Sequence, residues 1–393
     1  MKISFDAIGE KYVTFLAGSG AAKGQVCKVS ANDTVSGCAA GEAFCGVVAE
    51  VRDGCAAVVM GVKSGEVLAL ATYPTYDPTT FNRDYESLST DDRLPLFNRA
   101  TDGVYAPGST FKLCTAVAAL ESGIITPTTT IRDQGVYTYY AYPQPKCWIY
   151  RQYGSTHGSI NVSQAITESC NYFFYETGRL TGIETIDNYA TQFGLGRSTG
   201  IETGDSKGAL ASPEYAKANE LEWTDGQTIT AAIGQSYNLF TPIQLANYVA
   251  TLVGDGEHYK AHLLKNVKSY DNSSMIYAYD EGPENTVSIS DSTLQAVKKG
   301  MYGVANSTLS SQFSRCIVTC GAKTGSAQVG TDIANGTFVC FAPYDDPQIA
   351  VAVVIEKGGS GAALAGVAVD IVNAYFSREE IGTAIIGENT LIS

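Results

Sequence analysis

Five apolar segments of strand length constrain the fold most, because they fall into two groups near opposite ends of the chain. The two early segments, residues 56–62 and 66–74, are joined by Lys63-Ser64-Gly65, a turn sequence that predicts a β-hairpin. The three late segments span residues 316–325, 336–343 and 349–356. Two strands early and three late predict one antiparallel sheet, closed by distant parts of the chain.

Helical periodicity fills the chain between these two groups of strands. Residues 109–122 carry apolar side chains at helical spacing and end at Gly123, a residue type favoured just after a helix. Similar periodicity runs through residues 160–180, 184–194 and 241–253. An Ala-rich helix follows the last strand and extends to about Phe376. We therefore predict an α+β fold with helices packed on an antiparallel sheet.

Residues 1–54 differ in composition from the rest of the chain. They are rich in Gly, Ala, Val and Ser, contain no Pro, and read as short strands broken by turns. We predict a small β-rich module at 1–54 and a main domain at 55–393. The pattern assigns the module no role, and one interpretation makes it an assembly or binding module and the functional part of the chain.

Charge and hydropathy exclude several classes of protein. The 26 Lys and Arg residues against 40 Asp and Glu give a formal charge of −14. Binding to nucleic acid rewards clustered basic residues, so we expect no nucleic acid partner. No apolar run approaches the ~18–20 residues of a membrane span, and residues 1–20 lack the continuous apolar stretch of a signal peptide. Ten cysteines are too few for a disulfide-built scaffold at this length, and they include no C-x-x-C pair.

A serine and a lysine three residues apart mark the first candidate site. Ser109 and Lys112 follow the turn Tyr105-Ala106-Pro107-Gly108 and stand at the start of a predicted helix. This spacing puts both side chains on one helical face, so the amine can take the proton of the hydroxyl and make it a nucleophile. S-x-x-K is expected about once or twice by chance in ~400 residues, and an exposed Ser and Lys on a helix remain the alternative interpretation.

Two further short motifs follow later in the chain. Ser169-Cys170-Asn171 lies within a predicted helix, but Ser30-Ala31-Asn32 and Ser236-Tyr237-Asn238 also match S-x-N, and any of them can be a cap or a turn. Lys323-Thr324-Gly325, followed by Ser326, ends a predicted strand, where Gly lets a substrate backbone approach and Lys supplies charge for a carboxylate. K-T-G arises by chance in roughly one chain in ten of this length, so an edge-strand lysine before a turn is the alternative.

The order of the three motifs is more informative than any one of them. S-x-x-K, then S-x-N, then K-T-G is the signature of β-lactamases and penicillin-binding proteins. The surrounding sequence resembles a class B penicillin-binding protein transpeptidase domain from about residue 55 to 377, notably in FNRATDGVYAPGSTFK, AITESCNYFFYETGRLTGI and AAIGQSYNLFTPIQLAN. The segment CWIYRQYGSTHGSINVSQAITESCN is similar to the elongation-type, penicillin-binding protein 2-like branch. The resemblance implies the penicillin-binding/β-lactamase-like transpeptidase fold, with a five-stranded antiparallel sheet flanked by helices plus a helical subdomain.

The resemblance also implies catalytic roles for five residues. In that family the serine of the first motif is the nucleophile, here Ser109, and Lys112 is the base that deprotonates it. Ser169 relays a proton towards the leaving amine, while Asn171 holds the substrate amide and Lys112 in register. Lys112 must be neutral when it acts, and both burial and the nearby Lys323 are expected to lower its pKa.

Substrate binding and the reaction follow from the same resemblance. The strand with Lys323, Thr324, Gly325 and Ser326 pairs with the substrate backbone, and the N–H groups of Ser109 and Ser326 form the oxyanion hole. The implied substrate is a peptidoglycan stem peptide ending in D-Ala-D-Ala. The serine attacks the penultimate carbonyl, D-Ala leaves, and an amino group of a second stem resolves the acyl-enzyme. β-Lactam antibiotics leave a slowly resolving adduct, and the reaction requires no cofactor.

A structural zinc ion is a separate hypothesis. Some elongation-type relatives carry zinc near the mouth of the active site, bound by residues of this region. Here four residues supply a four-coordinate set of nitrogen, sulfur and oxygen ligands: Asp133, Cys147, His157 and Cys170. Part of this set lies in the Tyr-rich stretch 136–158, which reads as a long surface loop. Alternatively, Cys170 packs in its helix as a small apolar residue.

The resemblance places the protein at the outer face of the cytoplasmic membrane or in the cell wall. It implies a role in cell wall synthesis and cell shape, with a membrane glycosyltransferase as a partner. Family members normally begin with a membrane anchor, a pedestal domain and a helix before the first sheet strand. Residues 1–54 match none of these, which we interpret as a fusion or a truncation. Two competing functions stay open: a β-lactamase or D,D-carboxypeptidase that uses water as acceptor, and a non-catalytic penicillin-sensing or scaffold domain.

Overall fold

The computed structural model describes residues 54–142, 144–329 and 334–380, together with the backbone of four short strands within residues 1–53. The chain divides into two compact units, Met1–Asp53 and Gly54–Ser393. Each unit is described by itself below. All the residues that the sequence predicts as site residues belong to the second unit.

The first unit contains a four-stranded sheet in the order β1-β3-β2-β4. Its strands are β1 (Leu16–Ala17), β2 (Val26–Ala31), β3 (Thr34–Gly37) and β4 (Gly46–Val47). β2 pairs antiparallel with β3 and β4, whereas β1 pairs parallel with β3. The rest of this segment and all its side chains lie outside the described residues, so the role of the module at 1–54 stays a prediction.

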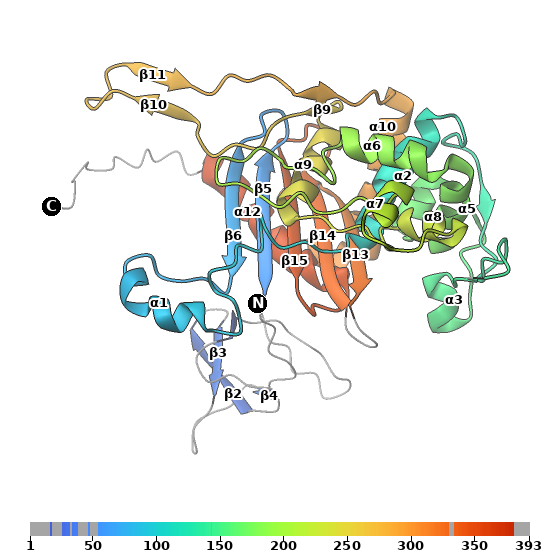
Figure 1. Cartoon of the computed structure of the whole chain (residues 1–393), viewed down its shortest axis with the longest axis horizontal. Coiled ribbons are helices and arrows are strands. Elements are labelled where there is room, and N and C mark those ends of the chain that lie inside the picture. The colour runs from blue at the N-terminus through green and yellow to red at the C-terminus, as the bar shows by residue number, and fades with distance from the viewer. Residues whose placement is uncertain are drawn as a thin grey trace. The chain divides into compact units, whose positions relative to one another are not determined.

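The second unit is built around the predicted five-stranded sheet (Figure 1). The strands are β5 (Cys55–Gly61), β6 (Val67–Tyr73), β13 (Gly321–Gln328), β14 (Ala334–Ala342) and β15 (Ile349–Ile355). They stand in the order β13-β14-β15-β5-β6, and every neighbouring pair is antiparallel. The late β15 pairs with the early β5, so the sheet joins both ends of the unit as the sequence predicts. The predicted fold class is therefore confirmed.

One of these strands starts later than its apolar pattern indicates. The pattern predicts a strand from residue 316, but β13 begins at Gly321. The preceding residues form a loop outside the sheet, where the Ile317 N–H donates to the Asn373 Oδ1 at 2.9 Å. The Cys316 N–H donates to the Phe313 carbonyl at 2.9 Å, which closes a turn rather than a strand pairing. Apolar character alone therefore did not locate the start of the strand.

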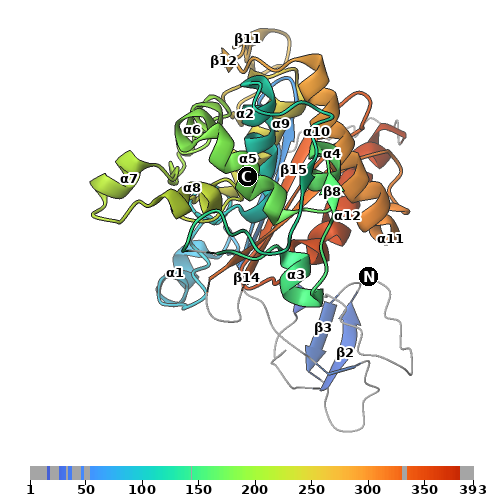
Figure 2. The same ribbon diagram turned by 90° about the vertical axis from the view of Figure 1, so that its right-hand side faces the viewer.

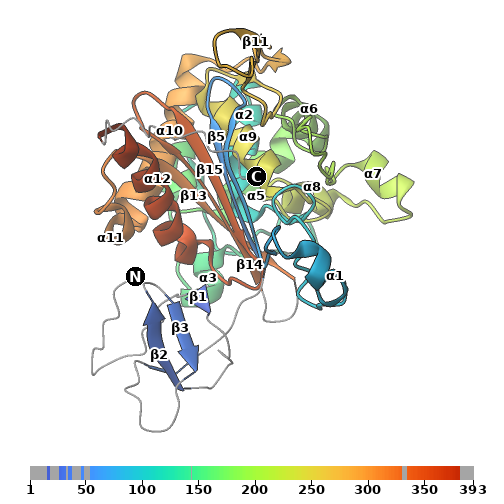
Figure 3. The ribbon, with the colours of Figure 1, turned by 90° about the vertical axis from the view of Figure 1, so that its left-hand side faces the viewer.

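Alternate residues of the central strands face two different cores, as the twofold repeat of a strand requires. On β15, Ala350, Ala352 and Val354 belong to the core that includes α9 (Pro242–Val253). The intervening Ile349, Val351 and Val353 belong to the core that includes α12 (Ala365–Glu380). Figures 2 and 3 show α9 on one face of the sheet and α12 on the other. Burial on both faces explains why this strand reads as a continuous apolar run.

A group of helices beside the sheet forms the predicted helical subdomain (Figure 2). It includes α2 (Lys112–Glu121), α4 (Val162–Thr167), α5 (Asn171–Thr181), α6 (Ile183–Gln192) and α8 (Asp225–Ala231). The helix predicted over 160–180 is thus two helices, α4 and α5. The break falls at Ser169, whose backbone has φ +52°. A non-glycine residue with positive φ cannot continue an α-helix, so this residue turns the chain.

The remaining elements are short, or lie at the edges of these layers. The helices are α1 (Phe81–Ser89), α3 (Trp148–Tyr153), α7 (Pro213–Ala218), α10 (Asp291–Gly303), α11 (Ser310–Phe313), η1 (Gly108–Thr110), η2 (Val304–Thr308) and η3 (Gly361–Leu364). The strands are β7 (Ile131–Arg132), β8 (Ser159–Ile160), β9 (Glu257–His258), β10 (Asn266–Lys268), β11 (Met275–Ala278) and β12 (Asn285–Thr286). None of the helices in the described part of the chain combines the length and hydrophobicity that crossing a membrane requires.

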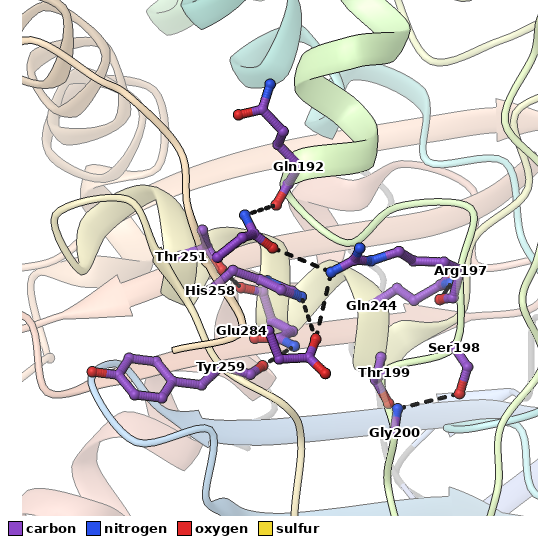
Figure 4. A network of polar contacts seen from close by, with 12 residues as sticks. Gln192, Arg197, Ser198, Thr199, Gly200, Gln244, Thr251, His258, Tyr259 and Glu284 are labelled. Atoms are coloured by element: carbon purple, nitrogen blue, oxygen red, sulfur yellow. Dashed lines mark hydrogen bonds and ion pairs between the residues drawn. The ribbon is translucent and has the colours of Figure 1, made fainter. Parts of the chain in front are cut away.

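A network of polar contacts ties α9 to the segments that cross it (Figure 4). The Thr251 hydroxyl and the His258 Nδ1 lie 3.0 Å apart, and the Gln244 side chain donates to the Arg197 carbonyl at 2.6 Å. The Arg197 guanidinium donates in turn to the Glu284 carboxylate at 3.4 Å. Burial, with a smaller effect of the Arg197 charge, lowers the pKa of His258 to about 4. The histidine is therefore neutral in the folded protein near pH 7.

Candidate active site

Ser109 lies in a short turn that η1 forms just before α2. The turn packs against the edge strand β13. Gly108 has φ +54°, and a Cβ atom built on it would lie 2.8 Å from the Ser326 carbonyl oxygen. A Cβ on Gly325 would lie 2.5 Å from the Pro107 carbonyl oxygen. Two glycines therefore let the strand with the K-T-G motif reach the turn that presents the half-buried Ser109.

Lys112 begins α2 and is fully buried, and its ammonium group points at the second motif. Its Nζ donates to the Asn171 Oδ1 at 2.6 Å and to the Ser169 carbonyl at 2.8 Å. The Ser169 hydroxyl oxygen lies 3.3 Å from the same nitrogen. The first two sequence motifs, separated by almost sixty residues along the chain, thus meet through one amine.

Lys323 completes the cluster from β13. It is also fully buried, and its Nζ donates to the Ser169 hydroxyl at 2.9 Å and to the Thr324 carbonyl at 3.0 Å. The Ser169 hydroxyl therefore lies within hydrogen-bond reach of two amines. Thr324 is half-buried and Ser326 is exposed, so solvent reaches both of these residues, unlike Lys323.

Burial perturbs the pKa values of both lysines, because it removes the water that stabilises an ammonium group. It lowers the pKa of Lys112 to about 8. It lowers the pKa of Lys323 well below its usual range, and the charge of Lys112 adds to this effect. The sequence analysis predicted that burial and the charge of Lys323 both lower the pKa of Lys112. In the structure burial alone lowers the pKa of Lys112, whereas the charge of Lys112 lowers the pKa of Lys323. A neutral amine is thus accessible near neutral pH.

The four predicted metal ligands also come together, beside the second motif. Their ligand atoms all lie within 4.8 Å of one another. The His157 Nδ1 is 2.8 Å from the Asp133 Oδ2 and 3.5 Å from the Cys147 Sγ. The Cys170 Sγ is 3.8 Å from the Cys147 Sγ and 3.7 Å from the Asp133 Oδ2. Cys170 does not pack as an isolated apolar residue, because its sulfur belongs to this cluster.

The chemistry of this cluster fits a zinc ion. The hydrogen bond with Cys170 lowers the pKa of Cys147 to about 5, so one thiolate forms readily. Burial opposes ionisation of Asp133, but hydrogen bonds from the backbone of His157 and Gly135 and from the His157 ring hold its pKa below the usual range. The His157 Nε2 is buried and has no hydrogen-bond partner among the described residues, while Nδ1 faces the cluster. Two sulfurs, one nitrogen and one carboxylate suit tetrahedral Zn²⁺.

Two segments contact the Ser109 turn or the K-T-G strand, although the sequence analysis gave their residues no role in the site. The Gly234 carbonyl accepts a hydrogen bond from the Gly108 N–H at 2.9 Å, and the adjacent Gln235 side chain donates to the Ser326 carbonyl at 3.4 Å. At the start of η3, the Gly361 N–H donates to the Ser326 hydroxyl at 3.1 Å. The positive φ of Ser236 at +62° marks a turn in the first segment, for which the Gly-Gln-Ser sequence was the available signal.

A cavity of about 530 Å³ lies between α4 and α10. Its walls include His157, Glu168, Lys299 and Tyr302, but not the serine or the lysines of the motifs. The cavity and the cluster of motif residues are therefore two different candidate sites. We assign the candidate active site to the converging polar groups, because buried amines around one hydroxyl supply reactive chemistry that the cavity walls do not.

The fold and this cluster together define the class of protein. A five-stranded antiparallel sheet with a helical subdomain, and a serine and two lysines at their junction, form the penicillin-binding transpeptidase architecture. The chain belongs to the penicillin-binding protein transpeptidase family, because the family model for the penicillin binding protein transpeptidase domain matches residues 55–376.

Curated relatives place the chain in the elongation-type branch that the sequence predicted. It is 35% identical over 336 residues to the peptidoglycan D,D-transpeptidase MrdA of Escherichia coli K12, covering 79% of this chain and 52% of that protein. It is 33% identical over 356 residues to MrdA of Haemophilus influenzae, covering 83% of this chain and 53% of that protein. The chain thus spans about half the length of these relatives.

A solved structure supports the same placement. Pseudomonas aeruginosa PBP2, crystallised in complex with WCK 5153, is 30% identical and superposes with a TM-score of 0.74, covering 87% of this chain and 76% of that chain. Helicobacter pylori PBP2 in complex with MreC is 27% identical and superposes with a TM-score of 0.71, covering 84% of this chain and 61% of that chain. The predicted family and branch are therefore confirmed.

Proposed function

We propose that this chain is a peptidoglycan D,D-transpeptidase that cross-links stem peptides through an acyl-enzyme on Ser109. The observation that carries the proposal is the convergence of two fully buried lysines, Lys112 and Lys323, on the Ser169 hydroxyl beside the turn that bears Ser109. Burying two amines costs stability, and active sites are where such perturbed groups concentrate. The names of the curated relatives support the same activity.

Acylation begins when neutral Lys112 accepts the Ser109 hydroxyl proton. The serine oxygen attacks the carbonyl of the penultimate D-Ala, and the backbone N–H groups of Ser109 and Ser326 stabilise the oxyanion. Ser169, hydrogen-bonded to both lysines, passes a proton to the departing amine as the C–N bond breaks. The leaving group is D-Ala, and an ester joins the stem peptide to Ser109.

The acyl-enzyme is resolved by the reverse proton path. An amino group from a second stem attacks the ester, its proton passes to the relay, and the Ser109 oxygen leaves as the hydroxyl. Asn171 holds both Lys112 and the substrate amide, which keeps base and carbonyl in register. The reaction needs no cofactor because every proton transfer stays within these side chains and the substrates.

The edge strand β13 offers the binding surface for the stem peptide. It pairs only with β14 within the described sheet, so its outer edge is available for an extended backbone. Thr324 and Ser326 lie on this strand beside the Ser109 turn, where they bind the terminal carboxylate of the substrate. Gly325 leaves room for close approach of the backbone. β-Lactam antibiotics occupy the same place and acylate Ser109.

We further propose that Asp133, Cys147, His157 and Cys170 hold a structural Zn²⁺ ion. The ligand atoms lie close enough to share one ion, and the lowered Cys147 pKa favours a thiolate ligand. Bound zinc would supply a rigid cross-link between the Tyr-rich loop and the turn between α4 and α5. The proton transfers of the reaction remain with the serines and lysines.

We also propose a location at the outer face of the cytoplasmic membrane or in the cell wall, because the substrate is there. A membrane glycosyltransferase is the proposed partner, since transpeptidation acts on newly polymerised strands. One structural neighbour, 28% identical with a TM-score of 0.74, comes from a study of how a peptidoglycan synthase complex coordinates polymerisation and crosslinking. MreC is bound in the structure of the Helicobacter pylori neighbour.

Covalent labelling with a fluorescent penicillin tests the proposal. We expect one labelled serine in the intact protein and no labelling in Ser109→Ala, whereas Ser311→Ala, at an exposed serine on α11, should label normally. Labelling that persists in Ser109→Ala refutes the nucleophile. Rapid turnover of a chromogenic β-lactam instead of stoichiometric trapping would favour a β-lactamase. Formation of cross-linked dimers from purified stem peptides separates a transpeptidase from a carboxypeptidase or a sensor.

A further inference from the structure

Two cysteines outside the active site face each other just before β13. The Sγ atoms of Cys316 and Cys320 lie 3.5 Å apart, in van der Waals contact. Cys316 is half-buried and Cys320 is buried. They lie in the loop between α11 and β13, and the second of them directly precedes the strand that carries Lys323.

The loop that holds these cysteines is anchored on two sides. The Asn373 side chain on α12 accepts from the Ile317 N–H at 2.9 Å and donates to the Arg315 carbonyl at 3.0 Å. The Tyr344 N–H donates to the Thr319 carbonyl at 2.9 Å. Because backbone groups of 315, 317 and 319 are all bonded to neighbouring elements, the fold itself holds the two sulfurs together.

The two thiols differ in a way that suits thiol–disulfide exchange. The hydrogen bond with Cys320 lowers the pKa of Cys316 to about 7, so a large fraction of this half-exposed thiol is ionised near neutral pH. The same contact and burial raise the pKa of Cys320. An accessible thiolate attacks a disulfide, and a buried neighbour within contact distance then displaces the attached group.

We propose that Cys316 and Cys320 form a reversible intramolecular disulfide by exchange with a small-molecule disulfide such as oxidised glutathione. The Cys316 thiolate attacks one sulfur of the oxidant and releases one thiolate, which leaves a mixed disulfide on Cys316. The Cys320 sulfur then attacks the Cys316 sulfur, and the second thiol departs with the proton of Cys320. One S–S bond forms in the protein, and the oxidant is reduced to two thiols.

The bond would close a small loop that leads directly into the K-T-G strand. It would constrain the segment from residue 316 to 320 in the unfolded chain and stabilise the entry into β13. The proposal does not rest on the proposed transpeptidase function, because the exchange needs only the two thiols and an oxidant. The alternative partner for Cys320 is Cys340, which lies buried on β14 opposite Ala322.

A single tryptic peptide makes the proposal directly measurable. Trypsin cleaves after Arg315 and Lys323 and so releases residues 316–323, CIVTCGAK, with both cysteines. The full-length protein is incubated with oxidised glutathione, and free thiols are then blocked with N-ethylmaleimide. The protein is digested with trypsin, and the peptide masses are measured by mass spectrometry. We expect this peptide to be lighter by two hydrogen atoms than the dithiol and to carry no maleimide. After reduction with dithiothreitol it should accept two maleimide groups.

Two single-cysteine variants define the mechanism. Cys320→Ser should stop at the mixed disulfide, with one glutathionyl group on Cys316, and Cys316→Ser should react much more slowly. Closure in the intact protein should also be faster than in the urea-unfolded chain, since the fold holds the sulfurs in contact. A peptide that keeps two maleimide groups after oxidation overturns the proposal, and so does a cross-link to the peptide that contains Cys340. Equal closure rates in the folded and unfolded chains also count against it.

Discussion

The hydrogen bond between Lys112 and Asn171 allows a quantitative test of the role proposed for this lysine. The Asn171 Oδ1 accepts from the Lys112 Nζ at 2.6 Å, and burial lowers the lysine pKa from 10.5 to about 8. About one tenth of the lysine is then neutral at pH 7, against roughly 0.03% for an unperturbed side chain. If Lys112 is the base, the acylation rate should follow this neutral fraction and rise about tenfold between pH 7 and pH 9.

Two substitutions at Asn171 should move this profile in opposite directions. Asn171→Asp places a carboxylate beside the ammonium group, and an opposite charge at this distance raises a lysine pKa by about 1–3 units after the cost of burying the carboxylate. The neutral fraction at pH 7 should fall about 10- to 1000-fold. Asn171→Leu keeps the size but removes the acceptor of the ammonium group, so the pKa of Lys112 should fall below that of the unchanged protein.

The assay is the second-order rate constant of labelling by a fluorescent penicillin, measured from about pH 6 to about pH 10. Both variants should lower the maximal rate, because Asn171 also holds the substrate amide. Only the midpoint of the pH profile separates a change in the Lys112 pKa from weaker binding of the substrate amide. The midpoint should lie near pH 8 in the unchanged protein, higher in Asn171→Asp and lower in Asn171→Leu. Three profiles with one common midpoint would show that the titrating base is not Lys112.

Three further predictions concern the turn, the metal cluster and the polar network. Gly108→Ala should slow acylation and cost about 1–3 kcal/mol of stability. The reason is that Gly108 has φ +54° and that the added Cβ would lie 2.8 Å from the Ser326 carbonyl oxygen. The control Gly123→Ala, at φ +71° in open space, should leave acylation unchanged. Elemental analysis should find one zinc ion per chain in the unchanged protein and none in Cys147→Ser, and this variant should have the lower melting temperature. An unchanged protein that contains no zinc contradicts the metal proposal. The folded-state pKa of His258, about 4, lies below the usual histidine value of 6.5. The contribution of neutral His258 to the free energy of unfolding should therefore be fully present above about pH 6.5. It should fall by up to about 3 kcal/mol as the pH approaches 4. Urea titrations of His258→Gln should show a smaller fall.

The sequence predicts the sheet well because its strands are buried on both faces. The alternation of Ala350, Val351 and Ala352 between two cores needs apolar residues at every position, and such a run is visible without a structure. The start of β13 was placed wrongly for the same reason. Cys316, Ile317 and Val318 are as apolar as a strand, yet their backbone groups bond to a turn and to α12.

The contacts that complete the site depend on backbone geometry and leave little trace in residue types. Gln235 and Gly361 both contact Ser326, one through a side-chain amide and the other through a backbone N–H. No residue-type pattern distinguishes a backbone N–H that binds a particular serine from any other. By contrast, the lysines could be predicted, because amine chemistry requires that residue type within a recognisable motif.

The break at Ser169 links the two clusters that the sequence treats as separate. Periodicity predicts one helix across this region, but the left-handed turn at Ser169 ends α4 and lets Cys170 begin α5 as its N-cap. In consequence, three consecutive residues face two sites: Ser169 and Asn171 contact Lys112, while the Cys170 sulfur contacts Asp133 and Cys147. An ion bound at this sulfur would hold the backbone between the proton relay and the amide. Loss of that ion should therefore reduce the maximal rate of acylation even though no proton passes through it.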